Sequence, residues 1–261
     1  MMQARAFSVL TFAALVGCHG GEQPTPSSGP AAPAVSTSPT PSSLPGTPTA
    51  ATDATTTETP PSATSAATAN GPWTFEDDSE GSSPAAFSFG RTGSGATGRW
   101  VIRTEADAPS PPNVLAQLDT DATDYRFPVA IARAPSLRDV RLSVRCKPVS
   151  GRVDQACGLV FRYQDDNNYF VARANALENN VRLYHVKDGK RRQIASWSGK
   201  VIAGKWHDYA VEARGDHIQV FWDGNKVLDH NDATFPDAGR VGVWTKADSV
   251  TYFDDLRAEA L

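Results

Sequence analysis

The sequence lacks the motifs of several large enzyme classes. It has no phosphate-binding glycine loop, no nucleophile elbow and no CxxC motif, so nucleotide, α/β-hydrolase and thioredoxin-type chemistry are not expected. His185, His207 and His217 are isolated and do not stand at the spacing of metal ligands. The function must therefore be sought in the fold and its surface.

Basic residues are neither abundant nor clustered. Lys and Arg number 25 against 29 Asp and Glu, for a net charge of −4, and no Lys/Arg block stands out. Phosphate binding needs a basic footprint. Nucleic acid is therefore not an expected partner.

Long hydrophobic runs are also missing. The only candidate, Ala6–Val16 after the positive Arg5, is too short to span a bilayer as a stable helix and fits a signal peptide over residues 1–17. It closes on Leu15-Val16-Gly17-Cys18, which resembles the lipobox of bacterial lipoproteins. The resemblance implies lipidation of Cys18 and a membrane anchor made of lipid. The alternative is an ordinary secretory signal in which Cys18 is accidental.

The residue after Cys18 bears on the membrane in which a lipoprotein is expected to reside. His19, and not the aspartate associated with inner-membrane retention, follows Cys18. We therefore expect a bacterial cell-envelope location at the outer membrane. Residues 18–70 then form a tether of Pro, Thr, Ser and Ala, with no aromatic residue. Such a composition cannot bury enough apolar area to fold, so this segment is expected to be disordered.

Two further cysteines, Cys146 and Cys157, lie in two β-like runs around a polar turn at Ser150-Gly151. If these runs form a hairpin centred between Gly151 and Arg152, the cysteines fall opposite each other, close enough for a disulfide. An export compartment permits one. Two buried free thiols are the alternative.

Residues 71–261 alternate between short β-like runs and turn signals. Asp223-Gly224, between alternating runs, is a strong hairpin signal. No long stretch has a helical period. The pattern predicts an all-β domain, a two-sheet antiparallel sandwich of the jelly-roll type.

Three segments of the second half carry a family resemblance. They are GLVFRYQDDNNYFVARAN from residue 158, KWHDYAVEARGDHIQVFWDGNKV from residue 205, and FPDAGRVGVWTKADSVTYFDDLR from residue 235. Together they resemble the concanavalin A-like lectin/glucanase superfamily, in particular the bacterial branch of family-16-glycoside-hydrolase-like or 3-keto-disaccharide hydrolase domains. The resemblance implies a concanavalin A-like jelly roll. It leaves activity open, because the superfamily includes lectins, adhesion modules and glycosidases.

A retaining glucanase of this fold needs two carboxylates about 5 Å apart. Glu76 and Glu80 have the spacing of the family's E-x-D-x-E signature. The intervening Asp77 and Ser79 are polar, however, where apolar residues must pack behind the sheet. We interpret the segment as an acidic loop, and no catalytic residue is assigned.

The same acidic loop raises the question of a metal. Jelly-roll carbohydrate modules often bind a structural calcium between their first and last strands, so Glu76 and Asp254 are expected as hard oxygen ligands. The alternative is that the aspartates only end a strand, in which case the protein has no cofactor.

The period of two predicts one surface shared by several strands. Over residues 158–186, three successive strands each have one apolar face and one face with Arg, Asn or Tyr. In an antiparallel sandwich the polar face points away from the partner sheet. The residues expected to bind a ligand on this face are Arg162, Tyr169, Arg173, Asn175, Arg182, Tyr184, Trp244 and Lys246. A plain solvated face is the alternative.

Two functional hypotheses follow. The first is a lipid-anchored cell-envelope protein that presents a non-catalytic carbohydrate-binding or adhesion-type sandwich, with a glycan as partner. The second is a glycoside hydrolase acting on keto-disaccharides or related glycosides. Only Asp165, Asp166 and Glu178 lie near the proposed face, and all three are expected in loops. The sequence therefore favours the binding protein.

Overall fold

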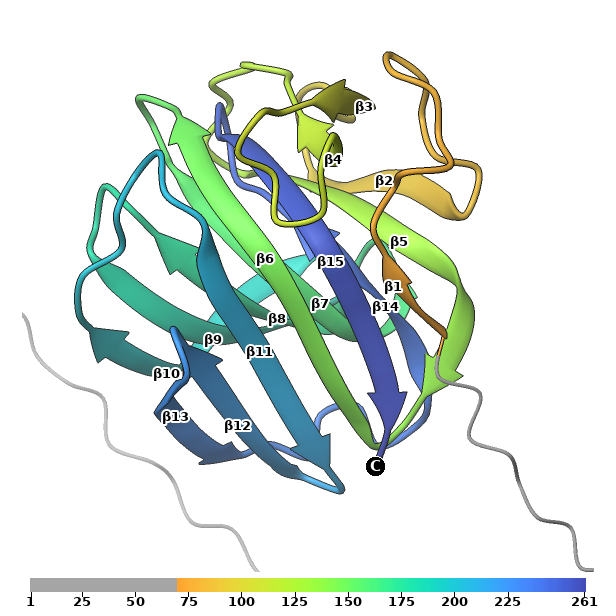
Figure 1. Cartoon of the computed structure of the whole chain (residues 1–261). Coiled ribbons are helices and arrows are strands. Elements are labelled where there is room, and N and C mark those ends of the chain that lie inside the picture. Colours follow the sequence, from red (N-terminus) through yellow and green to blue (C-terminus); the bar gives the residue numbers. More distant parts are fainter. Residues whose placement is uncertain (1–69) are drawn as a thin grey trace, which may run out of the picture. The chain divides into compact units, whose positions relative to one another are not determined.

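The structure is a computed structural model that describes residues 70–261, and every regular element in that range is a β-strand (Figure 1). The predicted signal peptide, Cys18 and all of the predicted tether except Asn70 lie outside these residues. Residues 70–261 include no helix long and apolar enough to cross a membrane. The strands form two antiparallel sheets, so the predicted all-β sandwich is confirmed.

Sheet A has eight strands and contains both ends of the described chain. Its path runs through β13 (Asn225–Asn231), β12 (His217–Trp222), β11 (His207–Arg214), β6 (Val140–Ser150), β15 (Val250–Ala260), β4 (Asn113–Gln117) and β3 (Trp100–Thr104), and β1 (Asn70–Trp73) pairs with β15. The predicted hairpin at Asp223-Gly224 joins β12 to β13. Both turn residues have positive φ, 47° and 77°, as the tight turns between twisted strands require.

Sheet B has seven strands. Its path runs through β10 (Lys190–Ser198), β9 (Asn180–Lys187), β8 (Asn168–Asn175), β7 (Ala156–Asp165), β14 (Gly239–Trp244), β5 (Arg126–Leu137) and β2 (Phe87–Gly93). Figure 1 shows it behind sheet A. Non-consecutive neighbours such as β7 and β14 make most of the pairing long-range.

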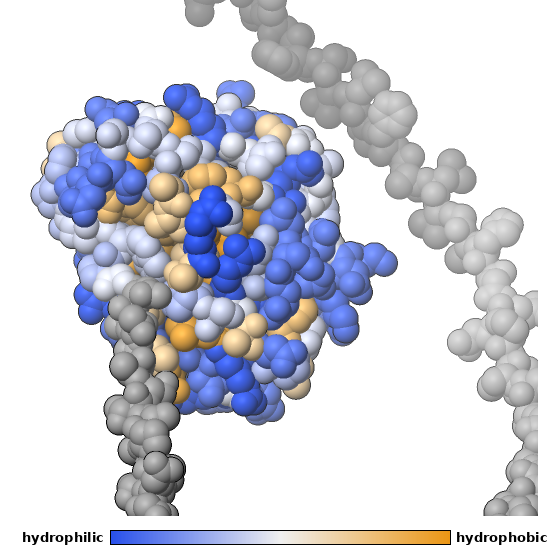
Figure 2. All heavy atoms as spheres, turned by 90° about the vertical axis from the view of Figure 1, so that its right-hand side faces the viewer, coloured by the Kyte–Doolittle hydropathy of each residue, from blue (hydrophilic) through white to orange (hydrophobic). Residues whose placement is uncertain are grey.

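Apolar side chains fill the space between the sheets. In β6 the alternate residues Val140, Leu142 and Val144 are buried there, and Phe161, Phe170 and Leu183 face them from sheet B. At the edge of this core Trp73 and Phe89 are only partly buried. Figure 2 shows the side where β1, β2 and β5 lie, with apolar surface broken up by hydrophilic residues. Alternation thus gives each sheet one face in the core.

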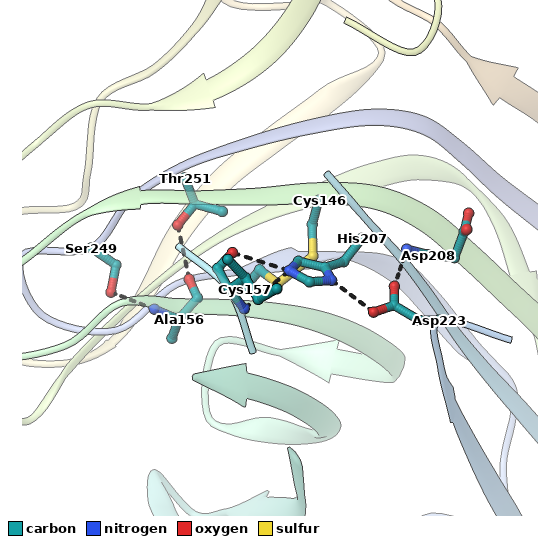
Figure 3. The surroundings of a disulfide bond; sticks show 9 residues. Cys146, Ala156, Cys157, His207, Asp208, Asp223, Ser249 and Thr251 are labelled. Atoms are coloured by element: carbon teal, nitrogen blue, oxygen red, sulfur yellow. Dashed lines mark hydrogen bonds and ion pairs between the residues drawn. A yellow bond between two sulfur atoms is a disulfide. The ribbon is translucent and has the colours of Figure 1, made fainter. Parts of the chain in front are cut away.

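A disulfide joins the two sheets through this core (Figure 3). Cys146 on β6 and Cys157 on β7 are both fully buried, and their Cα atoms are 6.5 Å apart. The predicted hairpin is wrong, because β6 pairs with β11 and β15 while β7 pairs with β8 and β14. Residues 151–155 cross from one sheet to the other, so the bond is an inter-sheet link.

Candidate functional site

The central strands of sheet B are buried on both faces, which the sequence did not predict. Nearly every residue of β7 and β8 is buried. A second apolar cluster covers the face that points away from sheet A, and it includes Tyr169, Tyr184 and Trp244. Seven of the eight predicted ligand residues belong to this face or to its end, namely all except Arg162.

The face is covered because sheet B curls over itself. The Tyr125 hydroxyl, at the start of β5, donates to the Gly189 carbonyl in the β9–β10 turn at 3.0 Å and accepts from the Arg191 N–H at 2.8 Å. The Arg191 guanidinium lies over the face, 4.4 Å from the Phe127 ring centroid and 4.6 Å from that of Tyr184. At another margin of this face, the Thr92 hydroxyl donates a hydrogen bond to the Asp166 carbonyl and so joins β2 to the β7–β8 turn. Trp244 and Tyr169 are therefore fully buried and cannot stack on a sugar in this conformation.

Arg162 does not lie on this face, so its predicted placement is wrong. It has a φ of +49° at a β-bulge, where Phe161 and Arg162 together oppose Val241 of β14. A bulge adds one residue and breaks the alternation of faces. The buried Arg162 guanidinium instead donates to the carbonyls of Arg138 and Phe235, both at 2.9 Å, and of Gly215. It ties three connections together at one end of the sandwich.

Arg173 stands at the centre of a polar network at the opposite end of the face. Its guanidinium donates to Asn180 at 2.8 Å and to Glu178 at 3.1 Å, and lies 3.9 Å from Asp154. Asp154 also accepts from Asn175 at 2.7 Å and pairs with Lys246 at 3.1 Å. These contacts pair the buried charges with one another, as burial demands, and leave only the Arg173 Nε of this guanidinium without a partner in the described residues.

The pKa values of two carboxyls in the network, Asp154 and Glu178, are shifted in opposite directions. Burial raises the pKa of Asp154, although the charges of Arg173 and Lys246 oppose this shift. For Glu178, burial also acts to raise the pKa, but hydrogen bonds from Asn180 and Arg173 outweigh it and lower the pKa to about 2. Asp154 is 1% exposed. The Glu178 side chain is 40% exposed, so only one of the two carboxyls reaches solvent.

Part of the network forms an exposed border, which we name the sheet B rim. Its members are Glu178, Arg182 and Asp124, which reach solvent, and the largely buried Lys246, which pairs with Asp124. Glu178 and Arg182 form an ion pair of 3.1 Å with side chains 40% and 33% exposed. Lys246 pairs with Asp124 at 2.5 Å, and the Asp124 side chain is 76% exposed. The rim therefore offers hydrogen-bond donors and acceptors to solvent, while Arg173 and Asn175 support it from below.

Asp154 was missed by sequence reasoning because the segment 151–155 that contains it has no motif that marks a functional residue. The structure shows how it is placed. The Asp248 carboxylate accepts the backbone N–H groups of Arg152, Val153 and Asp154 at 2.6 to 3.0 Å. Asp248 thus fixes the crossing segment from a distant part of the chain, and no local sequence signal marks this contact.

The predicted metal ligands lie on sheet A and beside it: Asp254 belongs to β15, between β6 and β4, and Glu76 follows β1. Asp254 is buried and its two oxygens accept the N–H groups of Ser110 and Asp255 at 2.8 and 2.7 Å. Glu76 accepts the N–H of Asn113 at 3.0 Å. Burial, with smaller contributions from Asp255 and Glu76, raises the pKa of Asp254 to about 7. No three His, Cys, Asp or Glu residues within 70–261 are grouped to hold a metal ion, and these carboxylates are held by protein donors. Calcium stays a prediction.

Several solved structures of other proteins are similar to this one. The carbohydrate-binding module CBM66 from Bacillus subtilis matches 66% of this chain and 95% of its own, with 19% identity and a TM-score of 0.53. A B. subtilis protein of unknown function with a galectin-like fold matches 66% and 88%, with 10% identity and a TM-score of 0.48. The GH43 protein BlXynB from Bacillus licheniformis matches 62% and 37%, with 14% identity and a TM-score of 0.44. No curated protein sequence matches the chain.

The two-sheet fold defines an antiparallel β-sandwich, a fold that this chain shares with the module CBM66. Within it, residues 130–258 match the family described as 3-keto-alpha-glucoside-1,2-lyase-like domain. The matched part runs from β5 to β15 and includes both cysteines of the disulfide and the Arg173 network. The resemblance of the second half to 3-keto-disaccharide hydrolase domains is confirmed, and the lipobox resemblance at Cys18 stays a prediction.

Proposed function

We propose that this protein is a lipid-anchored cell-envelope protein whose sandwich binds carbohydrate without cleaving it, through the sheet B rim. The observation that carries the proposal is the exposed Glu178–Arg182 pair above the buried Arg173. Ion-paired side chains offer fixed donors and acceptors side by side, and a sugar hydroxyl can both donate and accept. The family match and the likeness to a carbohydrate-binding module support a saccharide as the ligand.

The anchor in this proposal is carried by the sequence alone. The lipobox-like ending at Cys18 and the Pro/Thr-rich segment after it support a lipid anchor and a spacer. His19 supports a location at the outer membrane. The sandwich would then be displayed at a distance from the bilayer, where a binding domain can meet glycans.

A glycan array with the full-length protein in detergent tests the binding role. Arg182→Ala removes the exposed guanidinium, whereas Arg173→Ala would leave Asp154 with one cation fewer in a buried site and would endanger the fold. We expect Arg182→Ala to weaken binding of the best glycan at least about tenfold while the melting temperature stays unchanged. The matched control is Arg192→Ala, an exposed arginine of β10 outside the rim. Equal binding by wild type and Arg182→Ala would refute the rim as the site.

A glycoside-cleaving or eliminating enzyme is the second candidate, and one observation favours it. Asp154 and Glu178 contact the same guanidinium and have pKa values shifted in opposite directions. Such a split is typical of an acid and a base. Against it, Asp154 is buried with both oxygens occupied by Asn175, Arg173 and Lys246, so a substrate does not reach it in this arrangement. Product release from 3-keto-glucosides that Glu178→Gln abolishes would establish the enzyme over the binding protein.

A further inference from the structure

The outer face of sheet A contains a hollow whose lining shares no residue with the Arg173 network. It has a volume of about 510 Å³ and is lined by residues of β6, β11, β12 and β15. Leu142, Val144 and Val211 of these strands point into the core. Their neighbours Ser143, Arg145 and Ala210 therefore point to the opposite side and line the hollow.

The strand register explains why this face is hollow. One row of directly paired residues crosses four strands: Phe221 opposes Ala210, Ala210 opposes Ser143, and Ser143 opposes Arg257. The two central residues are small, so the floor is low. We name this row and its flanks the sheet A trough. An aromatic ring stands at one end of the floor and a guanidinium at the other.

Ion pairs form the two walls of the sheet A trough. On one side of Ser143 and Ala210, Arg141 pairs with Glu212. On the other side, Arg145 Nε lies 3.2 Å from Asp208 Oδ1. Each wall thus presents donors next to acceptors. The Arg141 guanidinium also lies 5.9 Å from the centroid of the Phe221 ring, which holds the aromatic end in place.

A bulge in β15 widens the trough at its arginine end. Asp254 opposes Arg145 and Arg257 opposes Ser143, so two residues of β15, Asp255 and Leu256, face the single Val144 of β6. Asp255 takes a φ of +51° there and lines the hollow. Bulges are frequent next to binding sites, where they re-aim side chains.

We infer that the sheet A trough is a second carbohydrate-binding site, which takes a short neutral saccharide. The volume lies within the range of small-molecule sites, about 300–1,000 Å³. The hydroxyls of a sugar both donate and accept, and the paired walls satisfy both needs. The guanidiniums of Arg141, Arg145 and Arg257 are balanced by the carboxylates of Asp208, Glu212 and Asp255. An anionic ligand therefore gains no net attraction, and neutral sugars are favoured.

This inference goes beyond the sheet B rim, since the two surfaces are on opposite sheets and share no residue. The protein would then hold glycan on two faces. Two contacts from one tethered domain raise the overall affinity for a polymer above that of either site. The two sites can be tested separately, because each has its own variants.

Two trough variants test the inference in the full-length protein on an array of neutral and acidic oligosaccharides. Ser143→Phe fills the floor with an outward-pointing ring and removes no hydrogen bond of the described structure. Phe221→Ala removes the aromatic end. The control is Ser136→Phe, the same change at an exposed position of β5 on the other sheet. Melting temperatures show that each variant is folded, and titration of the best neutral oligosaccharide measures its affinity.

We expect Ser143→Phe and Phe221→Ala to weaken that binding at least about tenfold, the loss typical of a blocked or removed anchor. Ser136→Phe should leave the affinity for the neutral glycan unchanged. If Phe221→Ala does not fold, the affinity of Ser143→Phe for the neutral oligosaccharide tests the inference by itself. Neutral-glycan binding that survives Ser143→Phe unchanged, a loss confined to acidic glycans, or no neutral glycan bound by wild type would each overturn the inference.

Discussion

Replacing Arg162 with methionine separates a structural role from a binding role. Methionine keeps an unbranched side chain that reaches as far as the arginine Nε, and it removes the charge and all donors. The Phe235 carbonyl is then left in a buried place without its 2.9 Å partner, while the Arg138 and Gly215 carbonyls are partly accessible to water. A buried acceptor without a partner costs about 1–3 kcal/mol.

The expected total loss in the free energy of unfolding is about 2–4 kcal/mol, from one fully buried acceptor and two partly buried ones. For a domain of this size, each kcal/mol lowers the melting temperature by roughly 2–4 °C. The variant should therefore melt roughly 4–16 °C lower, as measured by circular dichroism. Arg162→Lys keeps a charge but not the planar fork, so it should fall between wild type and Arg162→Met.

Glycan binding measured well below the melting temperature gives the second readout. Because Arg162 points away from both proposed binding surfaces, Arg162→Met should bind glycan as wild type does. A variant that melts like wild type but no longer binds would refute this reasoning. It would restore the prediction from the alternating pattern, in which Arg162 contacts the ligand.

Four further predictions concern other parts of the chain. Replacing Cys146 and Cys157 together by alanine should cost about 3 kcal/mol, from the short loop that the bond closes in the unfolded chain; urea unfolding measures this, and reactive thiols at both positions in the denatured wild type would contradict the bond. Glu178 has a pKa of about 2 in the folded state against 4.5 ordinarily, so its contribution to stability is present above about pH 4.5 and is lost as the pH falls toward 2. Glu178→Gln should flatten the acid limb of a melting-temperature profile, and an unchanged limb would count against the ion pairs. A calcium ion held by Glu76 and Asp254 predicts a higher melting temperature with CaCl₂ than with EDTA, and equal values would remove the metal. Cys18→Ser should move the protein from the membrane fraction to the soluble fraction, and retention at the membrane would exclude the lipid anchor.

Local patterns predicted the strands well. The alternating residues of β6, β8 and β9 and the Asp223-Gly224 turn follow rules that act over a few residues, so the sequence suffices for them. The sheet to which a strand belongs is a long-range matter. Residues 151–155 look like a hairpin turn, but β6 is taken by β11 and β15, and no short stretch contains that information.

The candidate site was predicted only in part for the same reason. Tyr169, Arg173, Asn175 and Trp244 do share one face, as alternation requires. Whether that face is open depends on Tyr125, which directly precedes β5, and on Arg191 of β10, which both reach over it. A side chain that covers a face contributed by other strands leaves no periodic signal. Burial of the face, and the buried Asp154 below it, could not be predicted from these residues.

Two β-bulges then account for where binding surfaces remain. In β7, the bulge at Arg162 turns a guanidinium away from the sheet B face and uses it to close one end of the sandwich. In β15, the bulge at Asp255 adds a residue beside the small Ser143 and widens the sheet A face. Both residues have positive φ, 49° and 51°, which costs free energy for a side chain with a Cβ. The cost in β7 is offset by three carbonyl hydrogen bonds. Asp255 has a hydrogen bond from the Ser110 hydroxyl at 2.6 Å, which fixes the bulge but leaves the trough beside it without a filling side chain. In β7 the carbonyls that accept from Arg162 occupy the space beside the bulge. In β15 the space beside Asp255 is free for a ligand, and this is the physical reason to look for sugar binding on sheet A.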